Sequence, residues 1–233
     1  MNILLTGASR GIGAATLGAF TSAGYRVVGH STRGGNGLIA GDLAEASAPR
    51  AIWEVALDQL GGRIDVLVNN AGIYEAVADT ASDDEWHAGW ARTITVNLQA
   101  AADLSRHAIA HFKANGGGRI VNVASRAAFR GDSPSHWHYA ASKSAMIGMT
   151  KTIARGYARE NILAFAVAPG FTVTDATEEY LEGRGGAQIL ADIPLGRVSS
   201  PAEVAEAIRW LATDAPAAST GSVIDLNGAS YVR

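Results

Sequence analysis

Seven short apolar runs, separated by alanine-rich amphipathic stretches, constrain the fold of this chain more than any other feature of its sequence. The runs read NILLT, RVVGH, LIAG, DVLVNN, RIVNVAS, ILAFAVA and SVIDLN, and the amphipathic stretches lie around residues 12–23, 45–60, 86–113, 138–158 and 201–212. Strands buried on both faces read as continuous apolar runs, and strands that alternate with helices imply parallel pairing through crossover helices. The alternation therefore predicts a doubly wound α/β fold, a parallel sheet of about seven strands with helices on both faces.

Length and composition favour one domain. The chain has 233 residues, of which 48% are hydrophobic, and no linker or repeat divides it, so we expect a single domain over residues 1–233. The polar, glycine-containing segment 174–197 interrupts the regular pattern after a strand end. Such a segment is typical of a lid over a binding site, and we predict one here.

Charge and residue usage exclude several classes of protein. A net charge of −3 argues against nucleic-acid binding, and the absence of cysteine excludes disulfides and cysteine-based zinc sites. His107 and His111 stand four residues apart with no accompanying carboxylate, so we expect no metal site. No apolar stretch approaches the ~20 residues needed to span a bilayer, and the first strand begins at Asn2. We therefore expect a cytoplasmic protein without a signal peptide or membrane partner.

The first strand runs into a glycine-rich turn. It ends in TGASRGIG, which places Gly7, Gly11 and Gly13 where the first helix begins. Glycine lets the backbone turn tightly and approach a pyrophosphate, whose charge is favoured at a helix N-terminus. The spacing is G-x-x-x-G-x-G and differs from the commoner G-x-G-x-x-G. At a junction of strand and helix, this cluster predicts a Rossmann-type dinucleotide site rather than a turn that only packs helix on strand.

The end of the second strand indicates which dinucleotide binds. An acid there would grip the ribose 2′-hydroxyl of NAD, but YRVVGHSTR contains none, and no acid precedes Asp42. The local charges are Arg10, Arg26 and Arg33, with His30 at the strand tip. A 2′-phosphate attracts guanidinium groups, so we predict NADP(H) in preference to NAD(H). The alternative is that these arginines are solvated and both cofactors are accepted.

Tyr139 and Lys143 are the first candidates for chemistry. Four residues apart on a predicted helix, they share one face, and a neighbouring cation lowers the pKa of a phenol from about 10. By itself the pair would more often be an ordinary helix surface. Ser125, however, closes the strand RIVNVAS, where strand ends line the ligand crevice of a doubly wound sheet. Asn97 lies within a predicted helix although asparagine is a poor helix former, and NNAG (69–72) ends another strand.

Together these positions resemble the short-chain dehydrogenase/reductase family over essentially the whole chain. The matching residues are TGASRGIG (6–13), NNAG (69–72), Asn97, Ser125, YAASK (139–143), PGFTVT (169–174) and LNGASYV (226–232). The overall pattern is most similar to the 3-oxoacyl-[acyl-carrier-protein] reductase subgroup. The resemblance implies that Tyr139 donates and accepts the proton, while Lys143 holds the nicotinamide ribose and lowers the tyrosine pKa. It further implies that Ser125 polarises the carbonyl and that Asn97 anchors a water in the proton relay.

The resemblance also implies the cofactor contacts. Arg10 would meet the 2′-phosphate, Asp42 the adenine and Asn69 the adenosine ribose, while segment 169–174 would flank the nicotinamide. The expected cofactor-binding residues are Gly7, Ser9, Arg10, Gly11, Ile12, Gly13, His30, Ser31, Arg33, Asp42, Leu43, Asn69, Ala71, Gly72, Tyr139, Lys143, Pro169, Gly170, Thr172 and Thr174.

The family implies that NADPH reduces a ketone or 3-oxo group of a small molecule to a secondary alcohol, reversibly, in a homotetramer or homodimer. The loop 126–138 is expected to line the substrate pocket, whereas segments 113–118 and 158–162 are poor in the basic residues that would dock an acidic carrier protein. Two alternatives stay open. One is NAD(P)-dependent oxidation of a sugar-like or sterol-like alcohol, and the other is a non-enzymatic cofactor sensor, which would typically lack the tyrosine or lysine.

Overall fold

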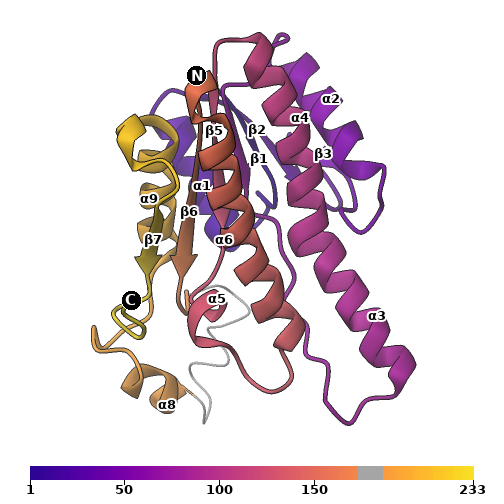
Figure 1. Ribbon diagram of the computed structural model, residues 1–233, viewed down its shortest axis with the longest axis vertical. Coiled ribbons are helices and arrows are strands. Elements are labelled where there is room, and N and C mark those ends of the chain that lie inside the picture. Colours follow the sequence, from indigo (N-terminus) through magenta and orange to yellow (C-terminus); the bar gives the residue numbers. More distant parts are fainter. Residues whose placement is uncertain (173–185) are drawn as a thin grey trace.

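The computed structural model describes residues 1–172 and 186–233, and within them seven parallel strands form one sheet (Figure 1). The strands pair in the order β3-β2-β1-β4-β5-β6-β7. Their bounds are β1 Asn2–Leu5, β2 Arg26–Ser31, β3 Ile39–Ala40, β4 Val66–Asn69, β5 Gly118–Val123, β6 Ile162–Pro169 and β7 Val223–Leu226. The strand number, the parallel pairing and the flanking helices confirm the predicted doubly wound fold.

The helices fall close to the predicted amphipathic stretches. They are α1 Gly11–Ser22, α2 Ala48–Gln59, α3 Asp83–Ile94, α4 Ala100–Ala114, α5 Ala127–Arg130, α6 Trp137–Tyr157, α8 Gly186–Ala191 and α9 Pro201–Thr213, with short 3-10 turns at η2 Ala158–Glu160 and η3 Ala217–Ser219. In the part of the chain that the structure describes, none of the helices combines the length and apolar character that crossing a bilayer requires.

Alternation along the strands divides the core between two faces of the sheet. Ile3 and Leu5 of β1 belong to the layer beneath α1 and α9, together with Phe20 and Ile208. Leu4, between them, belongs to the opposite layer, which α2, α4 and α6 cover (Figure 1). Because successive side chains of a strand point to opposite faces, a continuous apolar run is required for burial on both sides.

The single helix expected around 86–113 contains a π-helical turn. Residues Asp83 to Ala114 are helical throughout, but Thr95–Gln99 (η1) separates α3 from α4. Single π-helical turns inside α-helices occur frequently at functional sites. Asn97 lies in this turn.

The strand order fixes where a ligand can bind. From β1 the chain proceeds to β2 and β3 on one side, and then crosses to β4 and onward on the other. Ligands of doubly wound sheets bind beyond the carboxyl ends of the strands, at the point where the order reverses. In Figure 1 the carboxyl ends of β6 and β7 point toward α5 and α8. Of the predicted lid, residues 174–185 lie outside the described residues.

Candidate active site

The turn after β1 is tightly interlocked with the turn after β4. Gly7 has a φ of +67°, and a Cβ atom on Gly13 would stand 1.9 Å from the Gly7 carbonyl oxygen, so neither position accepts a side chain easily. The backbone amides of Asn70 and Ala71 donate to Thr6 Oγ1 at 3.0 and 3.1 Å. Asn70 Nδ2 donates in return to the carbonyl oxygens of Thr6 and Gly7 at 2.9 and 3.0 Å. The predicted glycine turn is thus a preformed backbone cradle.

The N-terminus of α1 is available to an anion. Arg10 is the N-cap residue, and no side chain caps the helix. Among the described residues, no hydrogen-bond acceptor meets the amides of Gly11, Ile12 or Gly13. Unpaired amides at a helix N-terminus favour phosphate. This donor set fits the pyrophosphate of a dinucleotide.

His30, predicted to contact the cofactor, supports the turn instead. Its side chain is buried, its Nδ1 accepts from the Gly7 amide at 3.4 Å, and its Nε2 lies 2.8 Å from the Gly41 carbonyl oxygen. These contacts require a neutral ring with the proton on Nε2, and burial lowers the pKa of His30. The side chain therefore offers no charge to a phosphate, because both nitrogens already have backbone partners.

The two candidate phosphate-binding arginines are exposed. Neither Arg10 nor Arg33 forms an ion pair with any residue in the described ranges. Ser31 is buried and its hydroxyl donates to the Gly34 carbonyl oxygen at 3.4 Å. Asp42 is exposed and accepts from the Ala44 amide at 3.0 Å. The edge beyond β2 therefore presents positive charge and no carboxylate before Asp42.

Two further predicted contacts have side chains that point into the protein. Leu43 is part of the core. Asn69 Nδ2 donates to Asn122 Oδ1 at 2.9 Å and to Ser105 Oγ at 3.2 Å, inside the layer that α4 covers. Side chains alternate along a strand, so Asn69, the last residue of β4, faces the core while Asn70 borders the cavity. Only the main chains of Leu43 and Asn69 remain for the predicted contacts.

Ser125, Tyr139 and Lys143 line one cavity of about 870 Å³. Ser125 lies just beyond β5 and accepts from the Ala127 amide at 3.1 Å, and a side-chain hydrogen bond joins it to the Tyr139 phenol. Tyr139 lies in the first turn of α6, and Lys143 follows one turn later. The Lys143 Nζ donates to the Val123 carbonyl oxygen at 2.8 Å and stands 5.8 Å from the centre of the Tyr139 ring. The structure thus brings the three predicted side chains together.

The electrostatics of this group differ from the expectation. Burial raises the pKa of Tyr139 to about 12, an effect that Asp132 reinforces and the Ser125 hydrogen bond opposes. Burial also lowers the pKa of Lys143 to about 8. The predicted lowering of the tyrosine pKa by Lys143 is therefore not observed, because loss of solvation dominates both groups. At neutral pH the phenol is protonated.

Asn97 is fully buried in the π-helical turn. Its Oδ1 accepts from the Ile73 amide at 2.8 Å, while its Nδ2 donates to the Ile73 carbonyl oxygen at 3.0 Å and to Ser142 Oγ at 3.3 Å. A Cβ atom on Gly72 would meet Asn97 Oδ1 at 3.3 Å and Lys143 Nζ at 3.4 Å. The side chain of Asn97 thus holds the chain beside the cavity. The sequence alone did not reveal this clamp on Ile73.

The cavity borders some of the predicted residues and not others. Those that line it are Ile12, Gly72, Ser125, Tyr139, Lys143, Pro169, Gly170 and Thr172. Those in the described ranges that do not line it are Gly7, Ser9, Arg10, Gly11, Gly13, His30, Ser31, Arg33, Asp42, Leu43, Asn69, Ala71 and Asn97. Thr174 lies outside the described residues. The predicted pocket loop 126–138 contributes Arg126, Ala127 and residues 130–133.

Sequence reasoning missed an aromatic and charged wall of the cavity. The Tyr74 ring meets the edge of Tyr139 at 4.8 Å and stacks on His136 at 3.9 Å. Arg126 packs over the Phe171 ring at 4.8 Å. Two signals were available: Tyr74 follows NNAG by two residues, and Arg126 directly follows Ser125.

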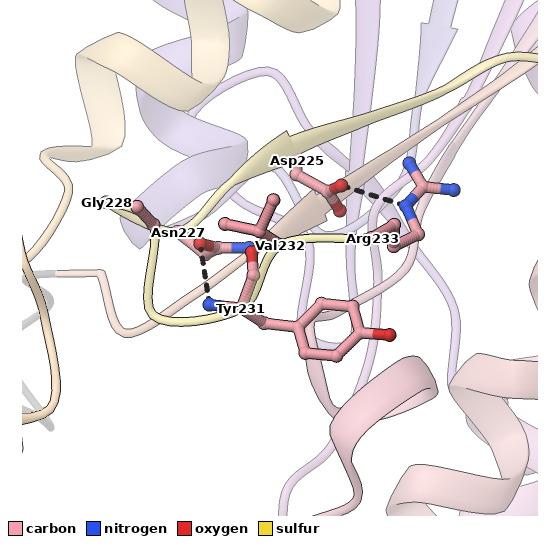
Figure 2. A pocket seen from close by; sticks show the side chains of 7 residues that line it. Asp225, Asn227, Gly228, Tyr231, Val232 and Arg233 are labelled. Atoms are coloured by element: carbon pink, nitrogen blue, oxygen red, sulfur yellow. Dashed lines mark hydrogen bonds and ion pairs between the residues drawn. The ribbon is translucent and has the colours of Figure 1, made fainter.

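A second hollow, of about 430 Å³, lies at the C-terminal turn after β7 (Figure 2). There Arg233 Nε donates to Asp225 Oδ2 at 2.9 Å, and the Tyr231 amide donates to Asn227 Oδ1 at 3.3 Å. Its polar groups thus pair with one another, and none of the predicted site residues lines it. The chemistry belongs to the larger cavity.

The two helix histidines that were weighed as metal ligands have structural contacts. His111 Nε2 accepts from the Ile64 amide at 3.1 Å, and its ring meets Trp53 at 5.8 Å. His107 stacks on the other side chain of this group, Trp53, at 6.3 Å. Both side chains therefore take part in packing between α2 and α4.

A dinucleotide-type sheet with this Ser–Tyr–Lys group defines the class: an NAD(P)-dependent oxidoreductase that acts on CH–OH or C=O groups. The family model for short chain dehydrogenase matches residues 1–185. The chain belongs to the short-chain dehydrogenase/reductase family.

Individual relatives agree with this assignment. The chain is 37% identical to 3-oxoacyl-[acyl-carrier-protein] reductase FabG of Thermotoga maritima, across 97% of this chain and 95% of the relative. It is 34% identical to the FabG of Escherichia coli, across 98% of this chain and 96% of that one. The ligand-free structure of an aldohexose dehydrogenase from Thermoplasma acidophilum superposes with a TM-score of 0.86 and 30% identity, covering 99% of this chain and 94% of that chain.

Proposed function

We propose that the protein is an NADPH-dependent reductase that converts a ketone or 3-oxo group into a secondary alcohol, reversibly. The observation that carries the proposal is the Ser125–Tyr139 hydrogen bond beside Lys143, within one cavity at the carboxyl ends of the strands. The names of the sequence relatives support the 3-oxo group, since those proteins are 3-oxoacyl-[acyl-carrier-protein] reductases.

The cradle would hold the dinucleotide through its backbone. The uncapped amides of residues 11–13 would bind the pyrophosphate, and the exposed guanidinium groups of Arg10 and Arg33 would meet a 2′-phosphate. Lys143 would hold the nicotinamide ribose, and Asp42 would meet the adenine. When bound, NADPH supplies the hydride that reduces the carbonyl carbon. The absence of an acid at the end of β2 favours NADP(H) over NAD(H).

Tyr139 would donate the proton. Because its pKa is raised to about 12, the phenol is protonated throughout the neutral range and can protonate the developing alkoxide. Ser125 Oγ accepts from the Ala127 amide, which leaves its own hydroxyl proton free to stabilise the same oxygen. Asn97 would act by positioning: it holds Ile73 and the π-helical turn through buried bonds, next to the expected relay water.

The test is turnover by the Tyr139→Phe variant. Oxidation of NADPH is followed by absorbance with a panel of ketones and 3-oxo esters, and NADH is tested in parallel. We expect turnover with NADPH to fall by about 1,000-fold, as for loss of a general acid, while NADPH binding stays within a few-fold of wild type. Retained turnover in this variant would falsify the assignment of the proton donor.

A secondary-alcohol dehydrogenase is the second candidate. The observation in its favour is the close superposition with the aldohexose dehydrogenase. Initial rates with aldohexoses and NADP⁺ or NAD⁺, compared with the reduction rates, distinguish the two directions. A non-enzymatic sensor is disfavoured because both Tyr139 and Lys143 line the cavity.

We also propose a homotetramer or homodimer in the cytoplasm. The amphipathic helix α9 carries Trp210, which is 38% exposed, on its outer side and offers a surface for a second copy. Light scattering after size exclusion decides the number of copies, and a monomeric mass contradicts the proposal.

A further inference from the structure

Arg126 stands in the wall of the cavity directly after Ser125. Its side chain is only 12% exposed, and its guanidinium group lies flat enough against Phe171 to be 4.8 Å from the ring centre. The backbone is fixed as well, since the Arg126 amide donates to the Pro169 carbonyl oxygen at 2.9 Å. A planar cation is therefore held beside the proposed reaction centre.

The guanidinium group is incompletely paired. Nη1 donates to Ser230 Oγ at 2.5 Å and lies 3.6 Å from Asp192 Oδ2, whereas Nε and Nη2 have no partner among residues 1–172 and 186–233. Asp192 is held more closely by Arg130, at 2.5 Å. Burial and the neighbouring Arg130 cation lower the pKa of Arg126, which indicates a charge without full compensation.

The other charges that line the cavity do not neutralise Arg126. The basic groups are Arg126, Arg130 and Lys143, and the acidic groups are Asp132 and Asp192. Asp132 accepts from the Tyr74 hydroxyl at 3.0 Å and from the Ser133 amide at 2.7 Å, so its carboxylate has partners of its own. One carboxylate is thus shared by two arginines.

We propose that the carbonyl substrate carries a free carboxylate, and that Arg126 binds it while Ser125 and Tyr139 hold the reacting carbonyl. A guanidinium group presents parallel N–H donors that match the two oxygens of a carboxylate. The inference rests on the proposed reductase function and narrows its substrate to an oxo acid, as opposed to a neutral ketone or an ester.

The experiment compares oxo acids with their own esters. Pyruvate, acetoacetate and levulinate are each paired with the ethyl ester, so that the position of the carbonyl stays constant within a pair. We expect at least one acid to exceed its ester in kcat/KM by about ten- to a hundred-fold, the range of a charge-assisted hydrogen bond. In Arg126→Gln that preference disappears through a higher KM for the acid, while the ester and NADPH keep their constants. Arg50→Gln, at an exposed ion pair with Glu54, is the control.

Asp192→Asn separates binding from a structural role. If Arg126 receives the substrate, removing the competing carboxylate lowers the KM of the acid and leaves the ester unchanged. If Arg126 only clamps Ser230 and Asp192 together, both variants lower the activity toward acid and ester equally, and the inference is overturned. A raised KM for NADPH with an unchanged acid preference overturns it as well.

Calorimetry keeps the inference testable if no carbonyl is turned over, an outcome that refutes the proposed function and not this one. The three acids and three esters are titrated into the enzyme with NADP⁺. Tighter binding of an acid that is lost in Arg126→Gln supports the carboxylate site, and equal binding of acids and esters contradicts it.

Discussion

Two walls of the cavity are built in different ways. The glycine wall, residues 6–13 and 70–72, is joined by hydrogen bonds of about 3 Å between backbone groups and the short side chains of Thr6 and Asn70. The arginine wall, residues 126–133 and 192, is joined by long side chains, and the Asp192 carboxylate that links two of them is 48% exposed. One wall is made mainly of backbone, and the other mainly of exchangeable side chains.

The difference has a consequence for evolution and for design. Steric limits at the glycine wall leave few acceptable residues, whereas a partly exposed ion pair contributes about 0–1 kcal/mol and can be replaced at little cost in stability. A cofactor shared by many enzymes is suited to the first kind of wall. A substrate particular to one enzyme is suited to the second.

The largest effect is expected from Gly13→Ala. Its Cβ atom would stand 1.9 Å from the Gly7 carbonyl oxygen and 2.7 Å from Asn70 Nδ2, so the backbone of the cradle must move. We expect the free energy of unfolding to fall by about 3 kcal/mol, as for an overpacked core, with loss of measurable NADPH binding. Thermal unfolding and nucleotide fluorescence measure both effects.

Gly18→Ala is the matched control in the same helix. A Cβ atom on Gly18 meets nothing within 4 Å, so the substitution only improves helix propensity and should stabilise the protein by up to ~1 kcal/mol. If the two variants behave alike, the glycine wall is no more sterically determined than the rest of α1, and the comparison of the walls fails.

Ser125→Ala tests the point where the walls meet. Loss of one donor to the developing oxyanion should lower kcat by about 100-fold, while the KM for NADPH stays unchanged because Ser125 is absent from the cradle. Steady-state kinetics with both substrates varied give the two constants separately. An equal loss in NADPH binding would show that the serine supports the cofactor and not the carbonyl.

Arg10→Ala and Arg33→Ala test the rim of the glycine wall. Each should raise the KM for NADPH by about tenfold, the loss of one charge-assisted contact with a phosphate, and should leave the KM for NADH unaltered. Arg26→Ala is the control, because Arg26 is also exposed but donates to the Gln59 carbonyl oxygen. A parallel rise for NADH contradicts a role in recognising the 2′-phosphate.

The sequence predicted the glycine wall well because its requirements are local. The spacing of Gly7, Gly11 and Gly13 at a junction of strand and helix can be recognised from neighbouring residues alone. The errors there concern side-chain direction. Asn69 faces α4 because it continues the alternation of β4, and His30 is neutral because Gly7 and Gly41, distant in the sequence, take both ring nitrogens.

The arginine wall was less predictable, since its contacts join residues far apart in the chain. Arg126 meets Asp192 and Ser230, and Tyr74 meets Asp132, across separations that no local pattern marks. The pKa values of Tyr139 and Lys143 depend on burial in the same way. Spacing placed the two side chains on one helix face, but only the three-dimensional surroundings determine whether desolvation or mutual charge dominates.

The smallest effect expected is a pH dependence of stability that comes from Lys143, which lies between the walls. Burial lowers its pKa from 10.5 to about 8, so between these values the unfolded chain binds more protons than the folded one. The free energy of unfolding must then rise with pH across this interval. Tyr139 acts oppositely, but only above its ordinary value of 10.0, because its pKa is raised to about 12. The window for the lysine is therefore pH 8 to 10, and its contribution is on the order of 2 kcal/mol.

Denaturant unfolding of the protein without nucleotide, at intervals from pH 7 to 10, measures this slope. In Lys143→Met we expect the rise to flatten and the stability at pH 7 to increase, because the variant no longer buries an ammonium group. Lys151→Met, on the exposed side of the same helix, should leave the slope unchanged. If the slope survives in Lys143→Met, the lysine does not titrate near pH 8, and its burial costs nothing. If the variant is more stable yet inactive, then Lys143 is retained at the expense of stability, as expected for a residue that serves the reaction.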